Sequence, residues 1–388
     1  MKRALILYGD GTQTLPVARS LHRLGYEVHA TYSSKWSYGY GCRYIKRQHF
    51  CGDTHDVEAF YAFVLQLVKN VKFDIVLPMH DDSALMLARH QDELLKHVSY
   101  VMPDEETFMR GFDKHKLMEV CRAKGYPHPM TTNVDGSHLE RVDMNGLRFP
   151  LLIKPNYTYG ARGMTFCDNA AELKERFPKV QQQFGDCHLQ TFVPEGGRQV
   201  EVQLYVGQNG ELVQASVIKK YRWYPEKGGS SCCNVSCRND EIVDICYRLL
   251  KDLGWRGFAD FDTIEDPQTG ELLIMELNPR VPACVKSCFA SGIDWADVIA
   301  SEYVGKAHSR YEMKREVWLR HLGFEVLWFF YSKNRWTTRP SWFKFLGRKV
   351  YYQDMSCWND PMPFIRGTIG NIKKQLSPDF RRQKSGGR

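Results

Sequence analysis

The first 32 residues restrict the fold of this chain more than any other segment. Residues 2–8 form an apolar run that ends in a Gly-Asp-Gly turn, and residues 15–24 place leucine and alanine on one face at helical spacing. A second apolar run follows at residues 27–32. Strand, tight turn, helix and strand in this order make a βαβ unit, whose two strands pair in parallel. The sequence therefore predicts an α/β fold that begins with a parallel sheet.

The glycine turn at Gly9 and Gly11 leaves two interpretations. It lacks the third glycine of the dinucleotide-binding fingerprint, so we favour a tight strand-to-helix turn over a dinucleotide site. A further strand at residues 73–78 leads to His80 and Asp81. Because open α/β sheets place ligands at the carboxyl ends of their strands, these two residues either contact a substrate or cap the next helix. We expect this first region to end at residue 112.

The remaining chain divides into three regions. We expect a second region at residues 113–188 and a third at 189–309, followed by a tail at 310–388. The second region has a buried strand at 151–153 and a helix at 170–184. For the third region the pattern predicts strands at 189–193, 198–206 and 211–218, a long basic loop at 219–238, a helix at 240–253, and a hairpin of strands 257–264 and 272–277.

That hairpin carries the strongest chemical signal. Asp260 and Asp262 alternate with Phe261, so both carboxylates project from one face of a strand, and Glu276 and Asn278 share a face of its partner. Pairing brings Asp262, Glu276 and Asn278 together, and such oxygen donors suit Mg²⁺. Arg280 follows two residues later and can hold an anionic intermediate. The alternative is an exposed acidic face with one arginine salt bridge.

Other residues suit a nucleoside triphosphate. Lys114 and Lys154 offer point charges to phosphate, and the loop at 156–163 has glycines whose backbone N–H groups can cover phosphates. A purine can lie along the extended segment 190–193, and Glu201 on the next strand can accept from ribose. The basic loop at 219–238, with Lys219, Lys220, Arg222 and Lys227, either touches an anionic substrate or is a solvated loop.

The ordered set of these motifs resembles the ATP-grasp superfamily. It runs Asp-Lys, strand-Lys-Pro, glycine-rich loop, Gln-x-Phe-Val, Glu, Asp-Phe-Asp and Met-Glu-Leu-Asn-Pro-Arg over residues 113–305, and residues 1–112 look like the Rossmann-like α/β domain that precedes this fold. By this resemblance Lys114 and Lys154 bind the phosphates of ATP, Arg280 and Lys154 serve catalysis, and Asp262, Glu276 and Asn278 hold one or two Mg²⁺ or Mn²⁺ ions. The nucleotide is further bound by Tyr159, Gly160, Arg162 and Gly163 in the lid loop, by Gln190, Thr191, Phe192 and Val193 at the adenine, and by Glu201 at the ribose.

The resemblance implies an ATP-dependent ligase that joins a small-molecule acid to an amine, of the D-aspartate ligase or carbamoyl-phosphate-synthase type. A kinase of the same fold and a nucleotide-binding regulator remain alternatives, and a homodimer is compatible with all three. Three departures affect the site. The glycine-rich loop has tyrosines where some relatives have glycines. Val281-Pro282-Ala283 replaces the small Gly/Ser-rich turn of many relatives, and Asp260 competes with Asp262 as metal ligand, of which we favour Asp262 by spacing.

Cysteine usage and the two ends of the chain bear on location. The twelve cysteines include no C-x-x-C pair, and residues 1–10 do not have the pattern of a signal peptide, so we expect reduced thiols in the cytoplasm. The longest apolar stretch of the tail, residues 326–331, is far shorter than the ~20 residues that a membrane helix needs.

Charge is distributed unevenly. The tail at 310–388 has 17 basic and 6 acidic side chains and five of the nine tryptophans, whereas residues 1–309 have 36 basic and 39 acidic side chains. The balance before the tail argues against a uniformly basic nucleic-acid-binding protein. This C-terminal aromatic and basic extension is either a packed subdomain or a surface for an anionic acceptor or for peripheral contact with the inner membrane face. Because the ATP motifs are complete by residue 305, we expect the tail to govern the acceptor or its location.

Overall fold

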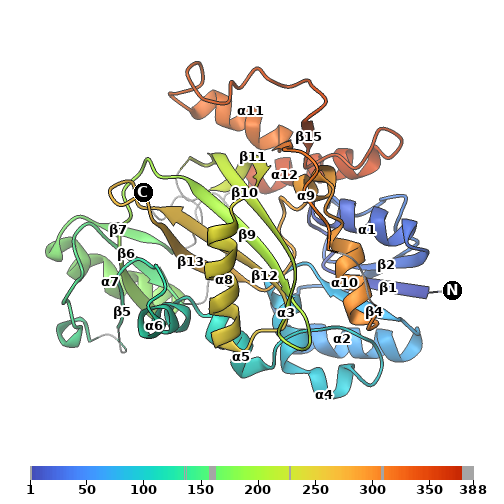
Figure 1. Ribbon diagram of the computed structural model, residues 1–388, viewed down its shortest axis with the longest axis horizontal. Helices are drawn as coiled ribbons and strands as arrows, with labels where there is room; N and C mark the ends of the chain where they lie inside the picture. The colour runs from blue at the N-terminus through green and yellow to red at the C-terminus, as the bar shows by residue number, and fades with distance from the viewer. Residues whose placement is uncertain are drawn as a thin grey trace.

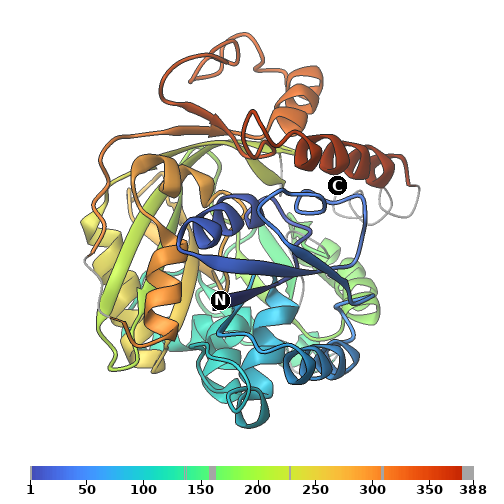
Figure 2. The same ribbon diagram turned by 90° about the vertical axis from the view of Figure 1, so that its right-hand side faces the viewer.

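The computed structural model describes residues 2–134, 136, 138–156, 163–226, 229–306 and 310–377. The expected nucleotide contacts Tyr159, Gly160 and Arg162 lie outside these ranges. The described residues form three sheets with helices packed on them (Figures 1 and 2).

The first region has the expected parallel sheet. Its strands are β1 (Lys2–Leu7), β2 (Tyr26–Tyr32), β3 (Arg47–Phe50) and β4 (Ile75–Pro78), in the order β3-β2-β1-β4. The helices are α1 (Thr14–Arg23), α2 (Val57–Asn70), α3 (Asp81–Arg89), α4 (Gln91–Leu94) and α5 (Glu105–Phe112). β1 pairs in parallel with β2 over residues 2–6 and with β4 over residues 4–7, so the βαβ prediction is confirmed. The chain leaves β4 towards His80 and α3, at the carboxyl edge of the sheet.

The second region is a smaller antiparallel sheet with its own core. Its order is β5-β8-β6-β7, from β5 (Thr131–Asn133), β6 (Leu151–Pro155), β7 (Thr165–Cys167) and β8 (Cys187–Thr191), with α6 (Lys114–Lys124), a 3₁₀ turn (Leu139–Arg141) and α7 (Ala170–Phe184). Leu151, Ile153, Phe177 and Leu189 form its buried centre. β8 spans the expected boundary after residue 188 and pairs with β5 and β6 of this sheet.

The third region is a seven-stranded sheet in the order β13-β12-β9-β10-β11-β14-β15. It contains β9 (Gln199–Val206), β10 (Leu212–Tyr224), β11 (Ser230–Cys237), β12 (Gly257–Glu265) and β13 (Leu272–Asn278), with α8 (Asp240–Leu253), α9 (Lys286–Ser291) and α10 (Trp295–Tyr303). The prediction of a loop at 219–238 is wrong, because β10 continues to Tyr224 and pairs with β11. Of the basic residues that suggested a loop, Lys220 and Arg222 contact acidic partners inside the fold, and the pairing is irregular between Lys220 and Trp223.

The tail completes this sheet instead of forming a separate extension. Its strands β14 (Trp318–Arg320) and β15 (Val350–Tyr352) add to the β11 edge, and α11 (Leu322–Tyr331) and α12 (Met362–Leu376) accompany them. Figure 2 shows α12 above the first region, and a Cβ on Gly367 would lie 2.2 Å from the ring of Tyr38. Packing this close needs a residue without a side chain. The tail therefore joins the third region to the first.

Candidate active site

The acidic residues of the β12–β13 hairpin meet as the alternation predicted. Asp262 lies opposite Glu276 on β13 and opposite Glu201 on β9, and Asp260 lies opposite Asn278. Asn278 Nδ2 lies 3.5 Å from Asp262 Oδ2. Three neighbouring strands thus present a row of carboxylates on one face of the sheet, because residues that face each other across strands project to the same side.

Lys220 on β10 compensates part of this negative charge. Its Nζ lies 2.8 Å from Glu201 Oε2 and also contacts Asp262 Oδ1. Burial opposes the charge, but Asp262 and Glu201 hold the pKa of Lys220 well above its ordinary value. In the same way Lys220 holds the pKa of Asp262 below its ordinary value in spite of burial. Sequence reasoning placed Lys220 in a loop; its position two residues beyond Ile218, the partner of Glu201, is visible only once β9 and β10 are paired.

Asp260 differs from Asp262 in its surroundings. It is buried, its Oδ1 has no hydrogen-bond partner among the described residues, and burial together with Glu201 raises its pKa well above the ordinary value. An unpartnered buried carboxylate oxygen is costly, and a proton or a cation would satisfy it. Asp260 and Asp262 therefore both remain candidates for the metal, although spacing favoured Asp262.

The donor set suits Mg²⁺ that is shared with a phosphate. Within the described ranges no group of three His, Cys, Asp or Glu is arranged to hold a metal by itself. Mg²⁺ is usually bound by one or two carboxylates, with phosphates and water as the other ligands. Two carboxylates and the Asn278 amide beside an unpartnered oxygen fit that pattern.

Two lysines approach the acidic row from the second region. Asp113 caps α6 by accepting from the backbone N–H of His115 at 2.9 Å, which places Lys114 in the first turn of the helix. Lys114 Nζ lies 3.5 Å from Glu276 Oε2. Lys154 on β6 donates to Gln190 Oε1 at 2.5 Å, and burial lowers its pKa to about 8 although Glu276 opposes this shift. Lys154 is half-buried, and a cation in this position can take an anionic ligand.

Arg280 brings the first region into the site. Its Nε donates to Asp81 Oδ1 at 3.0 Å, and its Nη2 lies 3.4 Å from Asn278 Oδ1. Asp81 opens α3, and His80 before it caps the same helix through the Asp82 N–H. Of the two roles that the sequence left open here, His80 takes the capping one, and Asp81 orients Arg280. Asp81 and Asn278 hold the guanidinium in one direction, and its pKa is raised by Asp81 and Asp260 against burial.

The expected adenine and ribose contacts stay predictions. Gln190 is buried between Lys154 and Thr131, and the backbone N–H groups of Thr191 and Phe192 donate to the carbonyls of Met130 and Pro150. Val193 follows directly and is buried. Glu201 lies in the acidic row with Lys220, and Cys284, just after the Val-Pro-Ala departure, donates to it at 2.7 Å. These contacts place Glu201 beside the candidate metal ligands.

The end of the lid loop shows why it needs glycine. Gly163 has φ +74, and a Cβ there would lie 2.8 Å from both Pro155 and Phe184. A side chain at this position would be strained by its backbone conformation and by its neighbours. Gly163 thus fixes how the chain returns to β7 from the loop.

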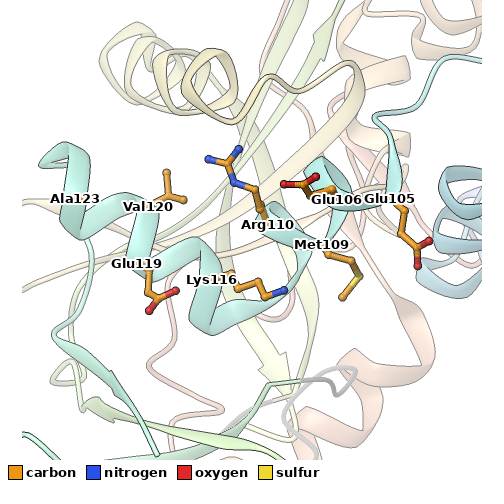
Figure 3. Close-up of a pocket in the computed structure, with 8 residues that line it drawn as sticks. All are labelled: Glu105, Glu106, Met109, Arg110, Lys116, Glu119, Val120 and Ala123. Atoms are coloured by element: carbon orange, nitrogen blue, oxygen red, sulfur yellow. The ribbon is translucent and has the colours of Figure 1, made fainter. Parts of the chain in front are cut away.

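A surface pocket lies apart from this cluster. It has a volume of about 730 Å³ and lies between α5 and α6, as Figure 3 shows. It is lined by Glu105, Glu106, Met109, Arg110, Lys116, Glu119, Val120 and Ala123. None of the candidate site residues lines it, so we do not place the chemistry there.

Comparisons with known proteins show what the chain is similar to. Residues 113–303 match the family described as carbamoyl-phosphate synthase L chain, ATP binding domain. The chain is 22% identical to pyruvate carboxylase of Bacillus subtilis over 80% of its own length and 28% of that protein. It is also 22% identical to D-aspartate ligase of Enterococcus faecium over 57% of this chain and 58% of the ligase. It thus spans less than two thirds of either relative.

A solved structure extends the likeness to the fold. Biotin carboxylase from Campylobacter jejuni superposes with a TM-score of 0.66 at 16% identity, over 82% of this chain and 75% of that one. The matched segment of the family contains Lys114, Lys154, Glu276 and Arg280, and the superposed length extends beyond it. Residues 113–303 therefore match an ATP-binding domain family, and the chain shares the ATP-grasp fold of biotin carboxylase.

Proposed function

We propose that this protein is an ATP-dependent ligase that joins a carboxylic acid to an amine. The observation that carries the proposal is the meeting of three regions at the acidic row. Lys114 contacts Glu276 from the second region, and the third region supplies Asp262, Glu276 and Asn278. Asp81 of the first region orients Arg280 towards Asn278. Cations on both sides of metal-binding carboxylates suit transfer of a phosphoryl group to an acid.

The proposed reaction has two steps. An oxygen of the substrate carboxylate forms a bond to the γ-phosphorus of ATP, and the bond from that phosphorus to ADP breaks. The amine nitrogen then bonds to the acyl carbon, phosphate leaves, and the nitrogen loses a proton. Mg²⁺ bound by Glu276, Asn278 and Asp262 or Asp260 would neutralise phosphate charge, and Mn²⁺ could replace it.

The residues of the chain supply position and charge. Lys114 and Lys154 hold the phosphates of ATP near the acidic row, and positioning is the main contribution that a protein makes to phosphoryl transfer. Arg280, fixed by Asp81, stabilises negative charge on the acyl phosphate or on the tetrahedral intermediate. Lys220 keeps Asp262 ionised, because it lowers the pKa of that carboxyl. We expect the loop at 156–163, most of which lies outside the described residues, to exclude water from the acyl phosphate.

The proposed substrate class is based on the relatives that the chain resembles. The match to D-aspartate ligase and to the carbamoyl-phosphate synthase family supports a small-molecule acid and a small-molecule amine.

We further propose a cytoplasmic location and a homodimer. Among the described residues no helix is both long and apolar enough to cross a membrane.

A product assay tests the reaction type. The protein is incubated with Mg-ATP and a matrix of acid and amine pairs, and ADP and free phosphate are measured separately. A ligase releases both products only when acid and amine are present. A kinase gives ADP without free phosphate, and a regulator gives neither product; either outcome would overturn the proposal.

A further inference from the structure

The segment from residue 326 to 349 contains no acidic side chain. It contains Lys333, Arg335, Arg339, Lys344, Arg348 and Lys349. The nearest acids along the chain, Glu325 and Asp354, are both fully buried. Even when Glu226, two residues beyond the end of the adjoining β10, is counted, positive charge greatly exceeds negative charge on this face. We call residues 326–349 the acid-free segment.

The same segment exposes large apolar side chains. Phe330, Tyr331, Trp336, Phe343 and Leu346 are each between 57% and 88% exposed. Most of them gather around Phe329, whose ring centroid lies 5.3 Å from Trp336, 5.9 Å from Phe343 and 6.2 Å from Phe330. Trp336 and Phe343 also stack on each other at 5.7 Å. Single exposed apolar residues are ordinary, but a group of aromatic rings in mutual contact is typical of an interaction surface.

The exposure is built into the fold. Below the aromatic group, Trp342 donates its indole N–H to the Glu325 carbonyl at 2.9 Å. Arg320 donates to the carbonyls of Trp342 and Lys344 at 2.8 and 2.7 Å, and Arg222 donates to the carbonyl of Pro340 at 2.6 Å. Buried arginines thus anchor the backbone of the acid-free segment while its aromatic side chains face outward. Figure 1 shows α11 and the chain after it at the opposite end of the molecule from α4.

The combination of exposed rings with unopposed cations selects one kind of partner. Aromatic and leucine side chains enter the headgroup region of a bilayer, while lysine and arginine keep their charges at the anionic surface. Each basic residue near such a surface adds to the attraction. We propose that the acid-free segment docks this protein on the surface of an anionic lipid bilayer. This inference does not depend on the proposed ligase activity.

Vesicle flotation with the full-length protein tests the proposal. Vesicles of phosphatidylcholine alone are compared with vesicles that also contain phosphatidylglycerol, at low and at high salt. We expect flotation with the anionic vesicles and its loss at high salt, because the charge attraction is screened. Trp336→Ala with Phe343→Ala should weaken binding at least tenfold, and so should Arg339→Glu with Lys344→Glu.

Matched variants separate this surface from general effects. Trp358→Ala removes a fully exposed tryptophan outside the segment, and Lys174→Glu with Arg141→Glu reverses two exposed charges in the second region. Both should float like the wild type. ATP affinity by calorimetry should be unchanged in all four variants, which shows that they are folded and keeps the result independent of the ligase proposal.

Several outcomes would overturn the proposal. Absence of flotation with anionic vesicles, or equal flotation with both vesicle types, is incompatible with it. Binding of single-stranded oligonucleotides that only the segment variants lose would assign the face to nucleic acid. A dimer in light scattering that the aromatic variants dissociate, without vesicle binding, would assign it to a second copy of the chain.

Discussion

Two residues of β10, Lys220 and Arg222, belong to two different groups of charged side chains. The two groups differ in how many of their charged atoms have partners within the protein. Lys220 enters the acidic row, where Asp262 and Glu276 keep 31% and 29% of their side-chain surface exposed and Asp260 retains an unpartnered oxygen. Arg222 enters the tail, where it and Arg320 share the fully buried carboxylate of Glu325. The first group is open and has an excess of acid, whereas the second is closed.

The charged atoms of the closed group already have partners within the protein, so few of them can bind a ligand. Arg222 contacts both oxygens of Glu325, at 3.1 and 2.7 Å, and Arg320 contacts one of them at 2.9 Å. The remaining guanidinium contacts go to backbone carbonyls of the acid-free segment. Charges with complete partners hold structure together, while charges without complete partners are available for binding. The Arg222 group therefore belongs to the part of the chain that assembles the tail, and the Lys220 group belongs to the part that we propose performs chemistry.

Removing Glu325 is the strongest test of the closed group. Glu325→Ala leaves two buried guanidinium groups without their carboxylate, so we expect a loss of about 3–5 kcal/mol in the free energy of unfolding. Urea denaturation measures it, and Glu271→Ala in the exposed β12–β13 turn is the control. A loss below about 1 kcal/mol would show that the tail does not depend on this group.

Removing Glu276 tests the open group in the opposite way. Glu276→Gln keeps the size of the side chain and removes a charge that is partly exposed to solvent, so the fold should survive. We expect turnover, measured as ADP release, to fall by about 10²–10³-fold. Glu271→Gln on the same hairpin should keep full activity. Full activity of Glu276→Gln at ordinary Mg²⁺ would remove this residue from the proposed site.

Lys154 tests whether the open group receives ATP. Lys154→Met should weaken ATP binding by about 1–3 kcal/mol, the cost of a lost charge-assisted hydrogen bond. Calorimetry measures the affinity, with Lys174→Met on the exposed face of α7 as the control. Equal affinities of Lys154→Met and the wild type would place the phosphates elsewhere.

The pH dependence of ATP binding is the smallest of the expected effects, but it tests Lys154 most specifically. Because the pKa of Lys154 is lowered to about 8, the side chain is charged below pH 8 and loses its charge as the pH rises through that value. The phosphates need the charged form, so the dissociation constant for ATP should rise between pH 7 and 9. Lys154→Arg stays charged over this range and should flatten that rise. An identical profile in both proteins would show that another group titrates.

Much of the fold was determined by local sequence. The helices at Ala170–Phe184 and Asp240–Leu253 end where the pattern predicted, because asparagine caps and glycine stops act within a few residues. The βαβ unit followed from apolar periodicity in the same way. The alternation of Asp260 to Asp262 and of Glu276 to Asn278 fixed which side chains share a face before the strands were paired.

The pairing of distant strands and their ionic contacts was decided only in three dimensions. The sequence predicted a loop at Lys220 and Arg222, because it does not reveal that these charges have partners 42 and 103 positions away. For the same reason the tail looked separable, although β14 extends the sheet and α12 packs on the first region. Sequence alone determined periodic local structure and the kinds of group that the chain presents. Tertiary structure decided which charges are satisfied, since burial and pairing depend on residues that the chain brings together only when it folds.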